Sequence, residues 1–328
     1  MSHPLDTVIG FPLWLRWKLY SAGVYESKKL PHPVISVGSV LLGGSGKTPM
    51  VELLAKELSK CGQKPAILTR GYGRKNKNER IVLLDGKCDW ELCGDEPLML
   101  SRKLPGVPII VHPNRYESAN LVADKVDCYI LDDGFQRLQI SRNLDILMFA
   151  GNEFETGLFP FGERRDGLWR IHRLNKSNAA IAFVPIDGDI DSFRKKLPKD
   201  LNTYRYRVIV EGLHSLSDWQ NILPPTTIAG KRVFLSAGIA RPERFFNIAK
   251  SIGTNAVGEM FFRDHYFFSQ SQVESVQEKA KNAGAELILT TEKDAVRIEK
   301  FGGDNIFALS IKIEIVDALE LCFWGSLI

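Results

Sequence analysis

The stretch Gly43-Gly44-Ser45-Gly46-Lys47-Thr48 is a glycine-rich turn that follows the apolar run Val34-Ile35-Ser36-Val37 and precedes a helix-like stretch over 50–59. This order of strand, glycine-rich turn and helix predicts a phosphate-binding loop. The glycines let backbone N–H groups face a polyphosphate at a helix N-terminus, Lys47 supplies a charge for the transferred phosphate, and Thr48 offers a hydroxyl to Mg²⁺. The strict motif has a glycine where this chain has Leu41, so Gly43 and Gly44 must supply the flexibility.

The composition is that of an ordinary globular protein. The chain has 328 residues, of which 44% are apolar and 25% charged, and this length suffices for two domains. The formal net charge of +4 is small, and the basic residues are scattered apart from the N-terminal region and residues 70–80. Charge therefore does not indicate a nucleic-acid partner, and no obligatory protein partner is indicated either.

The cysteine pattern favours reduced thiols in a cytosolic protein. The cysteines are odd in number and show no zinc-like Cys-x-x-Cys spacing. They are Cys61, Cys88, Cys93, Cys128 and Cys322.

The N-terminal segment, about 8–25, combines aromatic and basic residues. Phe11, Trp14 and Trp17 are interleaved with Arg16 and Lys18, a pattern that suits a helix lying in a membrane interface. A first helix packed on its own domain explains the same residues. No stretch approaches the roughly 20 apolar residues needed to span a bilayer, and no secretory cleavage pattern is visible, so we expect neither an integral nor a secreted protein.

Apolar segments recur at helix-length intervals along the chain. The runs at 64–69, 107–111, 126–131 and 179–184 predict strands, and together with the glycine-rich loop they predict an α/β fold with a P-loop NTPase-like, doubly wound parallel sheet. New strand-like runs at 232–236 and 287–291 predict a second, smaller α/β domain. We therefore expect an N-terminal P-loop domain over 1–203, a linker over 204–225 and a C-terminal domain over 226–328.

Charged residues follow two of these segments and recur in the segment 150–178. Asp132 and Asp133 end the run at 126–131, where a P-loop protein holds Mg²⁺ beside the phosphates, although a helix cap or turn uses the same residues. Arg70 lies in a basic loop at a strand end, a place where open α/β sheets bind ligands and where a solvated turn is the alternative. The segment 150–178, with its glycines and arginines, suits a mobile loop over an anionic substrate or a merely solvated loop.

Seven segments, in this order along the chain, make the sequence resemble the tetraacyldisaccharide 4'-kinase family, the lipid A 4'-kinases. They are Pro33-Val34-Ile35-Ser36-Val37-Gly38, Gly43 to Thr48, Thr69-Arg70-Gly71-Tyr72, Gly94-Asp95-Glu96-Pro97, Leu131-Asp132-Asp133-Gly134-Phe135-Gln136, Asp264-His265-Tyr266 and Thr290-Thr291-Glu292-Lys293-Asp294. Two positions depart from the family pattern. Arg137 stands where the family usually has His, and Arg164-Arg165-Asp166-Gly167 replaces a Leu-Arg-Glu-Pro segment.

The resemblance implies ATP-dependent, Mg²⁺-assisted phosphorylation of the 4'-hydroxyl of tetraacyldisaccharide 1-phosphate, which gives lipid IVA in lipid A biosynthesis. It implies a lipid-linked disaccharide as the substrate and a peripheral position on the cytoplasmic face of the inner membrane, and it favours the interfacial interpretation of the N-terminal helix. Two other functions stay open: a P-loop kinase of a soluble metabolite, and a nucleotide-switched membrane assembly factor that needs no acceptor base.

The resemblance also implies roles for particular residues. It pairs Asp95 with His265 as a catalytic dyad across a cleft, and which of the two accepts the proton stays open. We expect Lys47 and Arg165 to neutralise charge in the transition state. Lys293 either binds nucleotide or forms a salt bridge at a helix start.

The remaining expected site residues fall into three groups. The nucleotide ligands are Gly43, Gly44, Ser45, Gly46, Lys47, Thr48 and Lys293; the metal ligands are Thr48, Glu96, Asp132 and Asp133; the substrate ligands are Arg70, Tyr72, Arg115 and Gln136. Arg70 and Arg115 suit the anomeric phosphate of the substrate because planar guanidinium groups bind phosphate oxygens in pairs. A site that spans two domains predicts hinge closure on ATP.

Overall fold

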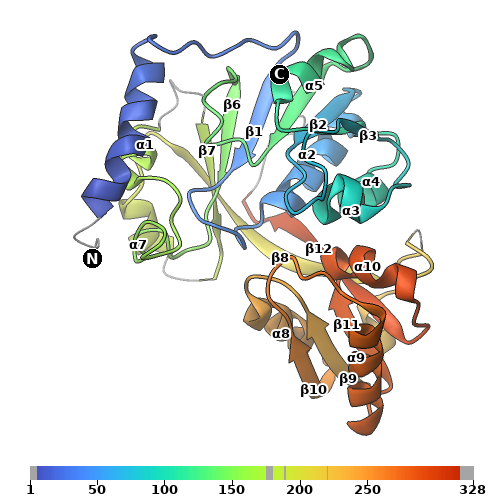
Figure 1. The fold of residues 1–328 in the computed structure, drawn as a ribbon. Coiled ribbons are helices and arrows are strands. Elements are labelled where there is room, and N and C mark those ends of the chain that lie inside the picture. The colour runs from blue at the N-terminus through green and yellow to red at the C-terminus, as the bar shows by residue number, and fades with distance from the viewer. Residues whose placement is uncertain (1–5, 175–179, 188–189, 220, 318–328) are drawn as a thin grey trace.

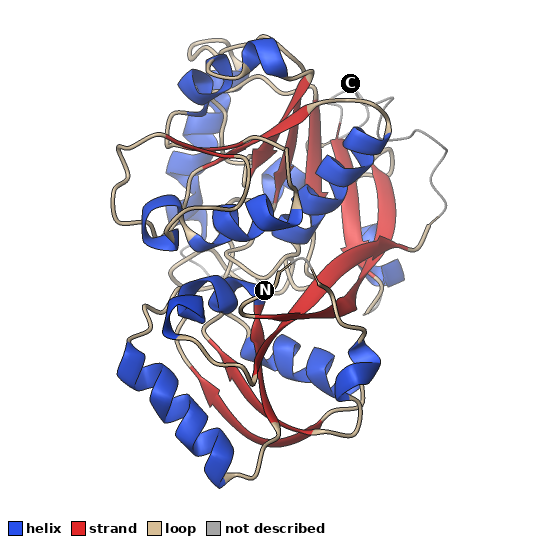
Figure 2. Ribbon diagram, turned by 90° about the vertical axis from the view of Figure 1, so that its right-hand side faces the viewer, coloured by secondary structure: helices blue, strands red, loops and turns tan. Residues whose placement is uncertain are grey.

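The structure is a computed structural model that describes residues 6–174, 180–187, 190–219 and 221–317. Cys322 lies outside these residues. In the described part of the chain the strands form one twelve-stranded sheet in the order β10-β9-β11-β12-β8-β7-β6-β1-β5-β2-β4-β3 (Figures 1 and 2). This sheet, with helices packed on it, confirms the predicted α/β fold class.

The elements have the following bounds. The strands are β1 (Val34–Gly38), β2 (Pro65–Thr69), β3 (Ile81–Leu83), β4 (Ile109–Val111), β5 (Cys128–Asp132), β6 (Leu144–Met148), β7 (Ala180–Pro185), β8 (Asn202–Ser215), β9 (Arg232–Ala237), β10 (Asn255–Phe261), β11 (Leu287–Thr291) and β12 (Ile306–Ile315). The α-helices are α1 (Asp6–Ser21), α2 (Lys47–Lys60), α3 (Trp90–Cys93), α4 (Asp95–Lys103), α5 (Arg115–Asn120), α6 (Leu168–Ile171), α7 (Ile190–Lys195), α8 (Pro242–Ser251), α9 (Gln270–Asn282) and α10 (Glu292–Ile298). Short 3-10 turns are η1 (Ala123–Lys125), η3 (Pro225–Ile228) and η4 (Glu299–Phe301).

The sheet consists of two parallel blocks joined by one antiparallel pair. Strands β8, β7, β6, β1, β5, β2 and β4 are parallel to their neighbours, and so are β10, β9, β11 and β12. The long strands β8 and β12 pair antiparallel and connect the blocks, and β3 adds an antiparallel edge to β4. Figure 1 shows the second block as the orange and red lobe below the first.

The predicted linker over 204–225 begins as part of this sheet. Strand β8 pairs with β7 through residues 202–206 and with β12 through residues 206–215. The alternation of Arg, Tyr and Val in this segment is a strand pattern with a period of two residues. The division into domains over 1–203 and 226–328 stays a prediction, with a pair of strands as the connection between them.

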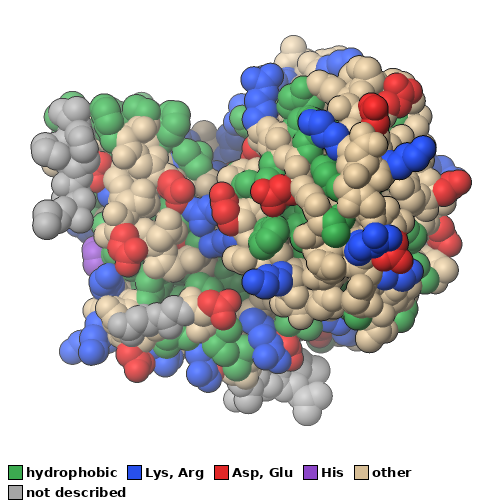
Figure 3. All heavy atoms as spheres, turned by 90° about the horizontal axis from the view of Figure 1, so that it is seen from below, with side chains coloured by type: hydrophobic (Ala, Val, Ile, Leu, Met, Phe, Trp, Pro, Cys, Tyr) green, Lys and Arg blue, Asp and Glu red, His purple; other side chains and the backbone are tan. Residues whose placement is uncertain are grey.

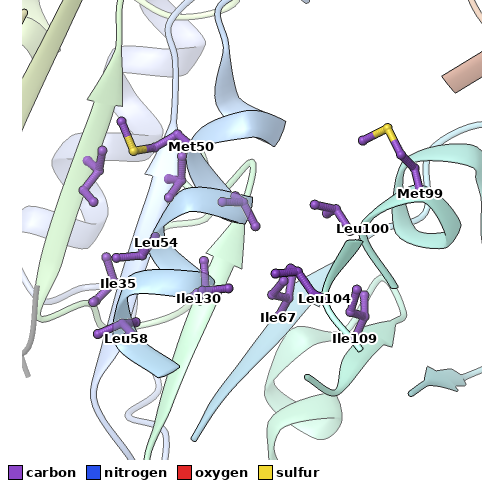
Figure 4. Close-up of a cluster of buried hydrophobic side chains, with 14 of the residues drawn as sticks. Ile35, Met50, Leu54, Leu58, Ile67, Met99, Leu100, Leu104, Ile109 and Ile130 are labelled. Atoms are coloured by element: carbon purple, nitrogen blue, oxygen red, sulfur yellow. The ribbon is translucent and has the colours of Figure 1, made fainter. Parts of the chain in front are cut away.

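Alternate residues of the parallel strands pack on opposite faces of the first block. Met50, Leu54 and Leu58 of α2, spaced four residues apart, lie over Ile35 and Ile130, as Figure 4 shows. Leu100 of α4 and Leu104, directly after this helix, cover the neighbouring strands in the same way. The opposite face packs against residues around α5 and against α6 and α7. This packing holds the N-termini of α2 and α4 at the carboxyl edge of the sheet.

A buried ion cluster around Lys103 joins the two blocks. The Lys103 ammonium lies 2.9 Å from the Glu52 carboxylate of α2 and 3.0 Å from the Glu292 carboxylate of α10, and it donates to Ser310 Oγ of β12 at 3.2 Å. Burial disfavours the charged amine, but the two carboxylates outweigh it and raise the pKa of Lys103. The cluster therefore stays ionised and connects α2, α4 and α10.

Replacing Lys103 by Met should lower the free energy of unfolding by about 3–5 kcal/mol, because Glu52 and Glu292 stay buried without their shared cation. Urea denaturation measures this loss. Lys56→Met is the matched control, since Lys56 contacts the same Glu52 at 2.7 Å with a side chain that is 39% exposed; its loss should stay under about 1 kcal/mol. Equal losses in the two variants would contradict the proposed importance of the buried cluster.

Candidate active site

One cleft of about 810 Å³ collects the carboxyl ends of strands from both blocks. Residues that follow β1, β2, β4 and β5 line one side, and residues that follow β9, β10 and β11 line the other. Open α/β sheets bind ligands at this edge. The cleft therefore lies where two sets of strand-end loops face each other.

The glycine-rich loop enters the cleft as the sequence predicts. Gly43, Gly44 and Gly46 have φ values of 61°, 63° and 76°, in the left-handed region that glycine adopts without strain, and α2 begins directly at Lys47. The Lys47 ammonium lies 3.3 Å from Ser45 Oγ and 3.6 Å from Asp133 Oδ1. Its burial lowers the pKa of Lys47 although Asp133 opposes this shift. An anion bound in the loop would attract the Lys47 ammonium strongly, because this cation is partly shielded from water.

Asp132 is the last residue of β5 and Asp133 follows it, and the two carboxylates have different electrostatic environments. Asp132 accepts a hydrogen bond from Thr69 Oγ1 at 2.7 Å, and burial together with the charges of Glu96 and Asp133 raises the pKa of Asp132 to about 6. Both carboxylate oxygens of Asp133 accept from the Arg165 guanidinium. Burial disfavours its charge, but Arg165 outweighs this effect and lowers the pKa of Asp133 to about 2.

The predicted metal ligands all line the cleft, but they do not form a closed metal cage. In the described part of the chain no group of three or more His, Cys, Asp or Glu side chains could hold a metal ion on its own. The Asp133 carboxylate is paired with Arg165, whereas the negative charges of Asp132 and Glu96 repel each other. These acids fit a divalent cation that takes its other ligands from phosphates and water.

Asp95 and His265, which are 170 residues apart, meet at the side of the cleft. Nδ1 of His265 lies 3.0 Å from Oδ2 of Asp95, and the ring of Tyr72 packs on the imidazole with centroids 4.9 Å apart. Asp95 begins α4, and its Oδ1 accepts from the backbone N–H of Glu96 at 2.7 Å. The geometry brings the predicted dyad into hydrogen-bonding contact, whereas its catalytic role stays a prediction.

Arg297 is a residue of this site that sequence reasoning missed. Its guanidinium contacts Asp95, Asp294 and the His265 ring. Arg297 lies four residues after Lys293 on α10, so the two side chains lie on the same side of this helix. This helical spacing from the recognised Lys293 segment is the signal that could have found Arg297.

Lys293 and Asp294 have different environments. The Lys293 ammonium lies 2.7 Å from Glu96 and faces the cleft. Asp294 is fully buried. The side chain of Thr291, the N-cap residue of α10, accepts from the backbone N–H of Asp294 and donates to its carboxylate, so Asp294 has a structural position. Burial disfavours the charge of Lys293, but Glu96, Asp95 and Asp264 together raise its pKa.

Three of the four predicted substrate ligands line the cleft, namely Arg70, Tyr72 and Arg115. Burial and the neighbouring Arg137 lower the pKa of Arg115 to about 9. Arg137, which stands where the family usually has His, also lines the cleft. Gln136 does not line it: its amide donates to the backbone oxygen of Ser39 at 3.0 Å and to Asp166 at 3.3 Å.

Three arginines of the segment 150–178 have acidic partners. The side chain of Arg164 is buried on Asp6 of α1 at 2.7 Å, and the buried Arg170 pairs with Asp166. Arg165, between them, reaches the cleft and Asp133. The mobility of this segment stays a prediction.

Two further arginines come from the second block. Arg244 donates to the backbone oxygen of Gly44, and Arg241 pairs with Glu163. Both line the cleft beside the glycine-rich loop. No sequence motif indicated them, because their partners lie about 80 to 200 residues away.

Comparisons with known proteins agree with one another. The family model described as LpxK, tetraacyldisaccharide-1-P 4'-kinase, matches residues 1–324. A tetraacyldisaccharide 4'-kinase of Desulfotalea psychrophila is 33% identical over 317 residues, which cover 92% of this chain and 88% of that protein. The one of Aquifex aeolicus is 33% identical over 319 residues, with 96% and 92% covered. The crystal structure of "apo" form LpxK from Aquifex aeolicus in complex with ATP is similar with a TM-score of 0.76 and 28% identity, over 95% of this chain and 93% of that chain.

Proposed function

The chain belongs to the tetraacyldisaccharide-1-P 4'-kinase family, and from this premise we propose that it transfers the γ-phosphate of ATP to the 4'-hydroxyl of tetraacyldisaccharide 1-phosphate in lipid A biosynthesis. One observation carries the proposal: the glycine-rich loop, the Asp132–Asp133 pair and His265 all line a single cleft, and Asp95 contacts His265 from behind it. A nucleotide-switched factor needs the first two features but not the third.

On the nucleotide side, the loop N–H groups and Lys47 bind the phosphates. Phosphoryl transfer requires mainly positioning and the neutralisation of charge on the transferred group. Lys47 faces the cleft from the start of α2, and Arg165 reaches it beside Lys47, since both contact Asp133. Arg165 would move from Asp133 to the transferred phosphate when substrate is present.

Thr48 and Asp132 would hold Mg²⁺, with Glu96 close by. The ion, when bound with ATP, neutralises charge on the phosphate oxygens. The raised pKa of Asp132 fits this assignment, because a cation bound beside Asp132 would relieve the repulsion among the buried carboxylates.

On the acceptor side, the Asp95–His265 pair would receive the proton of the 4'-hydroxyl. A carboxylate and an imidazole in contact fix each other's orientation and bring basicity near neutral pH. Arg70 and Arg115, which also line the cleft, would bind the anomeric phosphate already present on the substrate.

Transfer of labelled γ-phosphate from ATP to tetraacyldisaccharide 1-phosphate in detergent micelles tests the proposal. We expect labelled product with this acceptor and none with an acceptor whose 4'-hydroxyl is already phosphorylated. ATP hydrolysis without lipid product would favour a soluble acceptor, and nucleotide binding without turnover would favour the switch.

We also propose a peripheral position on the cytoplasmic face of the inner membrane, with α1 in contact with lipid. Among the described residues no helix is long and apolar enough to cross a membrane. Of the α1 residues only Gly10 is fully buried, although the helix is rich in Leu, Phe and Trp. Its other side packs on the protein, where Trp17 contacts Trp169 at 5.2 Å.

The outer side of α1 is apolar at helical spacing. Val8, Phe11 and Leu15 are 68%, 56% and 41% exposed and lie at i, i+3 and i+7. Phe159 and Phe161 add exposed aromatic rings from a loop tied to α1 through Asp6 and Arg164. Figure 3 shows hydrophobic side chains gathered at its upper left, whereas acidic and basic side chains are mixed elsewhere on this face. An apolar helix face with basic and Trp residues beside it suits a lipid interface.

Replacing Phe11 and Leu15 together by Ser should lower binding to anionic liposomes at least about tenfold, since burying such a side chain contributes about 1.5–3 kcal/mol. Co-sedimentation measures binding, and ATP hydrolysis without lipid should stay unchanged. Leu121→Ser, at an exposed site outside this surface, is the control. Unchanged liposome binding of the double variant would exclude α1 as the lipid-contacting element.

A further inference from the structure

We infer that Arg297 is a positioning residue for the Asp95–His265 pair, and that its guanidinium fixes the carboxylate against the imidazole. The inference rests on the proposed transfer reaction, in which this pair faces the acceptor. It concerns a side chain that lies behind the pair and does not line the cleft.

Arg297 is fully buried and has all of its charge neutralised by two acids. Its Nε donates to Oδ2 of Asp95 at 2.8 Å, and its Nη2 contacts the same oxygen. Its Nη1 donates to Oδ1 of Asp294 at 2.8 Å and to the backbone oxygen of Gly238 at 3.1 Å. A buried guanidinium without such partners would cost several kcal/mol, so these contacts hold one geometry.

Asp294 fixes the other side of the guanidinium. Its Oδ2 accepts from the backbone N–H of Gly238 at 2.9 Å and from Thr291 Oγ1 at 2.7 Å. The fork of Arg297 therefore reaches from a carboxylate anchored in its own helix to Asp95 of α4. A lysine carries one point charge and cannot contact both acids with the same planar geometry.

The third partner of this network is the imidazole. Nη2 of Arg297 lies 3.3 Å from Nδ1 of His265, and Nδ1 lies 3.0 Å from Asp95 Oδ2. His265 has φ 54°, a left-handed conformation that costs a non-glycine residue about 1 kcal/mol or more. Contacts must hold the ring in this conformation, and the Asp95 carboxylate supplies the hydrogen bond that sets its orientation.

The charges around Asp95 come from three elements. Glu96 follows it on α4, Lys293, Asp294 and Arg297 come from α10, and Asp264 and His265 come from the loop after β10. Burial disfavours the charge of Asp95, but His265, Lys293 and Arg297 hold its pKa well below the usual range.

The test compares Arg297→Met and Arg297→Lys with wild type in the lipid transfer assay. We expect Met to lower kcat about a hundredfold and to leave the KM for ATP within about threefold, because Arg297 contacts the acid–base pair and not the nucleotide loop. Lys should restore part of kcat.

Arg102→Met is the matched control for a merely structural role. Arg102 also lies on α4 and makes a two-contact ion pair at 2.5 and 2.6 Å, but its partner is Glu299 in the turn after α10 and not Asp95. Its kcat should stay near that of wild type. Equal losses of kcat in the two Met variants, or a KM for ATP that rises as much as kcat falls in Arg297→Met, would overturn the inference.

A second measurement does not depend on turnover. The ¹⁵N signals of His265, assigned by comparison with His265→Gln, should report a changed tautomer or hydrogen bonding of the imidazole in Arg297→Lys, which keeps the positive charge and should fold. Wild-type protein without lipid product would remove the proposed function but leave this result standing. Unchanged His265 signals would overturn the positioning role.

Discussion

Lys47→Met should lower kcat for lipid phosphorylation by about a thousandfold. Charge develops on the transferred phosphate, and a preorganised donor in a site shielded from water stabilises that charge by about 3–4 kcal/mol. Lys47 meets these conditions because its side chain is only 13% exposed and its ammonium lies beside Asp133, partly shielded from water. ATP affinity should fall less than kcat, since the loop N–H groups also bind the phosphates.

Steady-state kinetics and equilibrium nucleotide binding measure the two effects separately. Lys60→Met is the control at the other end of α2, where the lysine is 70% exposed and pairs with Glu57. It should leave kcat unchanged. A Lys47→Met enzyme that retains a tenth of the wild-type rate would show that the glycine-rich loop binds nucleotide without contributing to the transfer.

His265→Gln and Asp95→Asn should each lower kcat by about a hundredfold to ten-thousandfold, the range for loss of a positioned acid–base group. The two side chains contact each other, so the double variant should lose little more than the worse single variant. Asp95→Asn also leaves Arg297 facing a neutral amide, so we expect it to unfold more easily than His265→Gln.

Rates of the three variants in the lipid assay, with unfolding followed in parallel, test this coupling. His112→Gln, at a histidine whose ring contacts the nearby backbone of Asn114, is the control and should keep full activity. Losses that simply add in the double variant would mean that the two residues act independently, and the dyad assignment would then fail.

The local motifs were readable because their function depends on neighbouring residues. The glycines and Lys47 are close in sequence, so the order of strand, turn and helix predicts the loop conformation that the structure has. The strands at 34–37, 64–69 and 126–131 were predictable because buried parallel strands are short apolar runs.

Strands β8 and β12 were harder to predict because they have one face toward solvent or pair antiparallel at a junction. β8 was assigned to a linker on its polar and proline-containing surroundings, although its pairing partner β12 lies about a hundred residues further on. β-sheet pairing is non-local, so composition within a window does not reveal it.

The site divides along the same line. The identities of Lys47, Asp132, Asp95 and His265 follow from the sequence, since each stands in a short recognisable segment. Arg297, Arg241 and Arg244 enter the site only because folding brings α10 and α8 against α4 and the glycine-rich loop. Gln136, in contrast, carries a recognisable motif but turns its amide toward Ser39 and Asp166.

The chain's residues alone establish the α/β class, the nucleotide loop and the family, because these depend on local spacing and on residue type. The tertiary structure establishes which charges are buried and which of them meet. Burial and distance set the strength of an ion pair and the pKa of an acid, and both depend on segments that lie up to about 200 residues apart in this chain. For this reason, only the folded chain has an Asp95 carboxylate paired with Arg297. The same holds for the ion cluster around Lys103 that joins the two blocks.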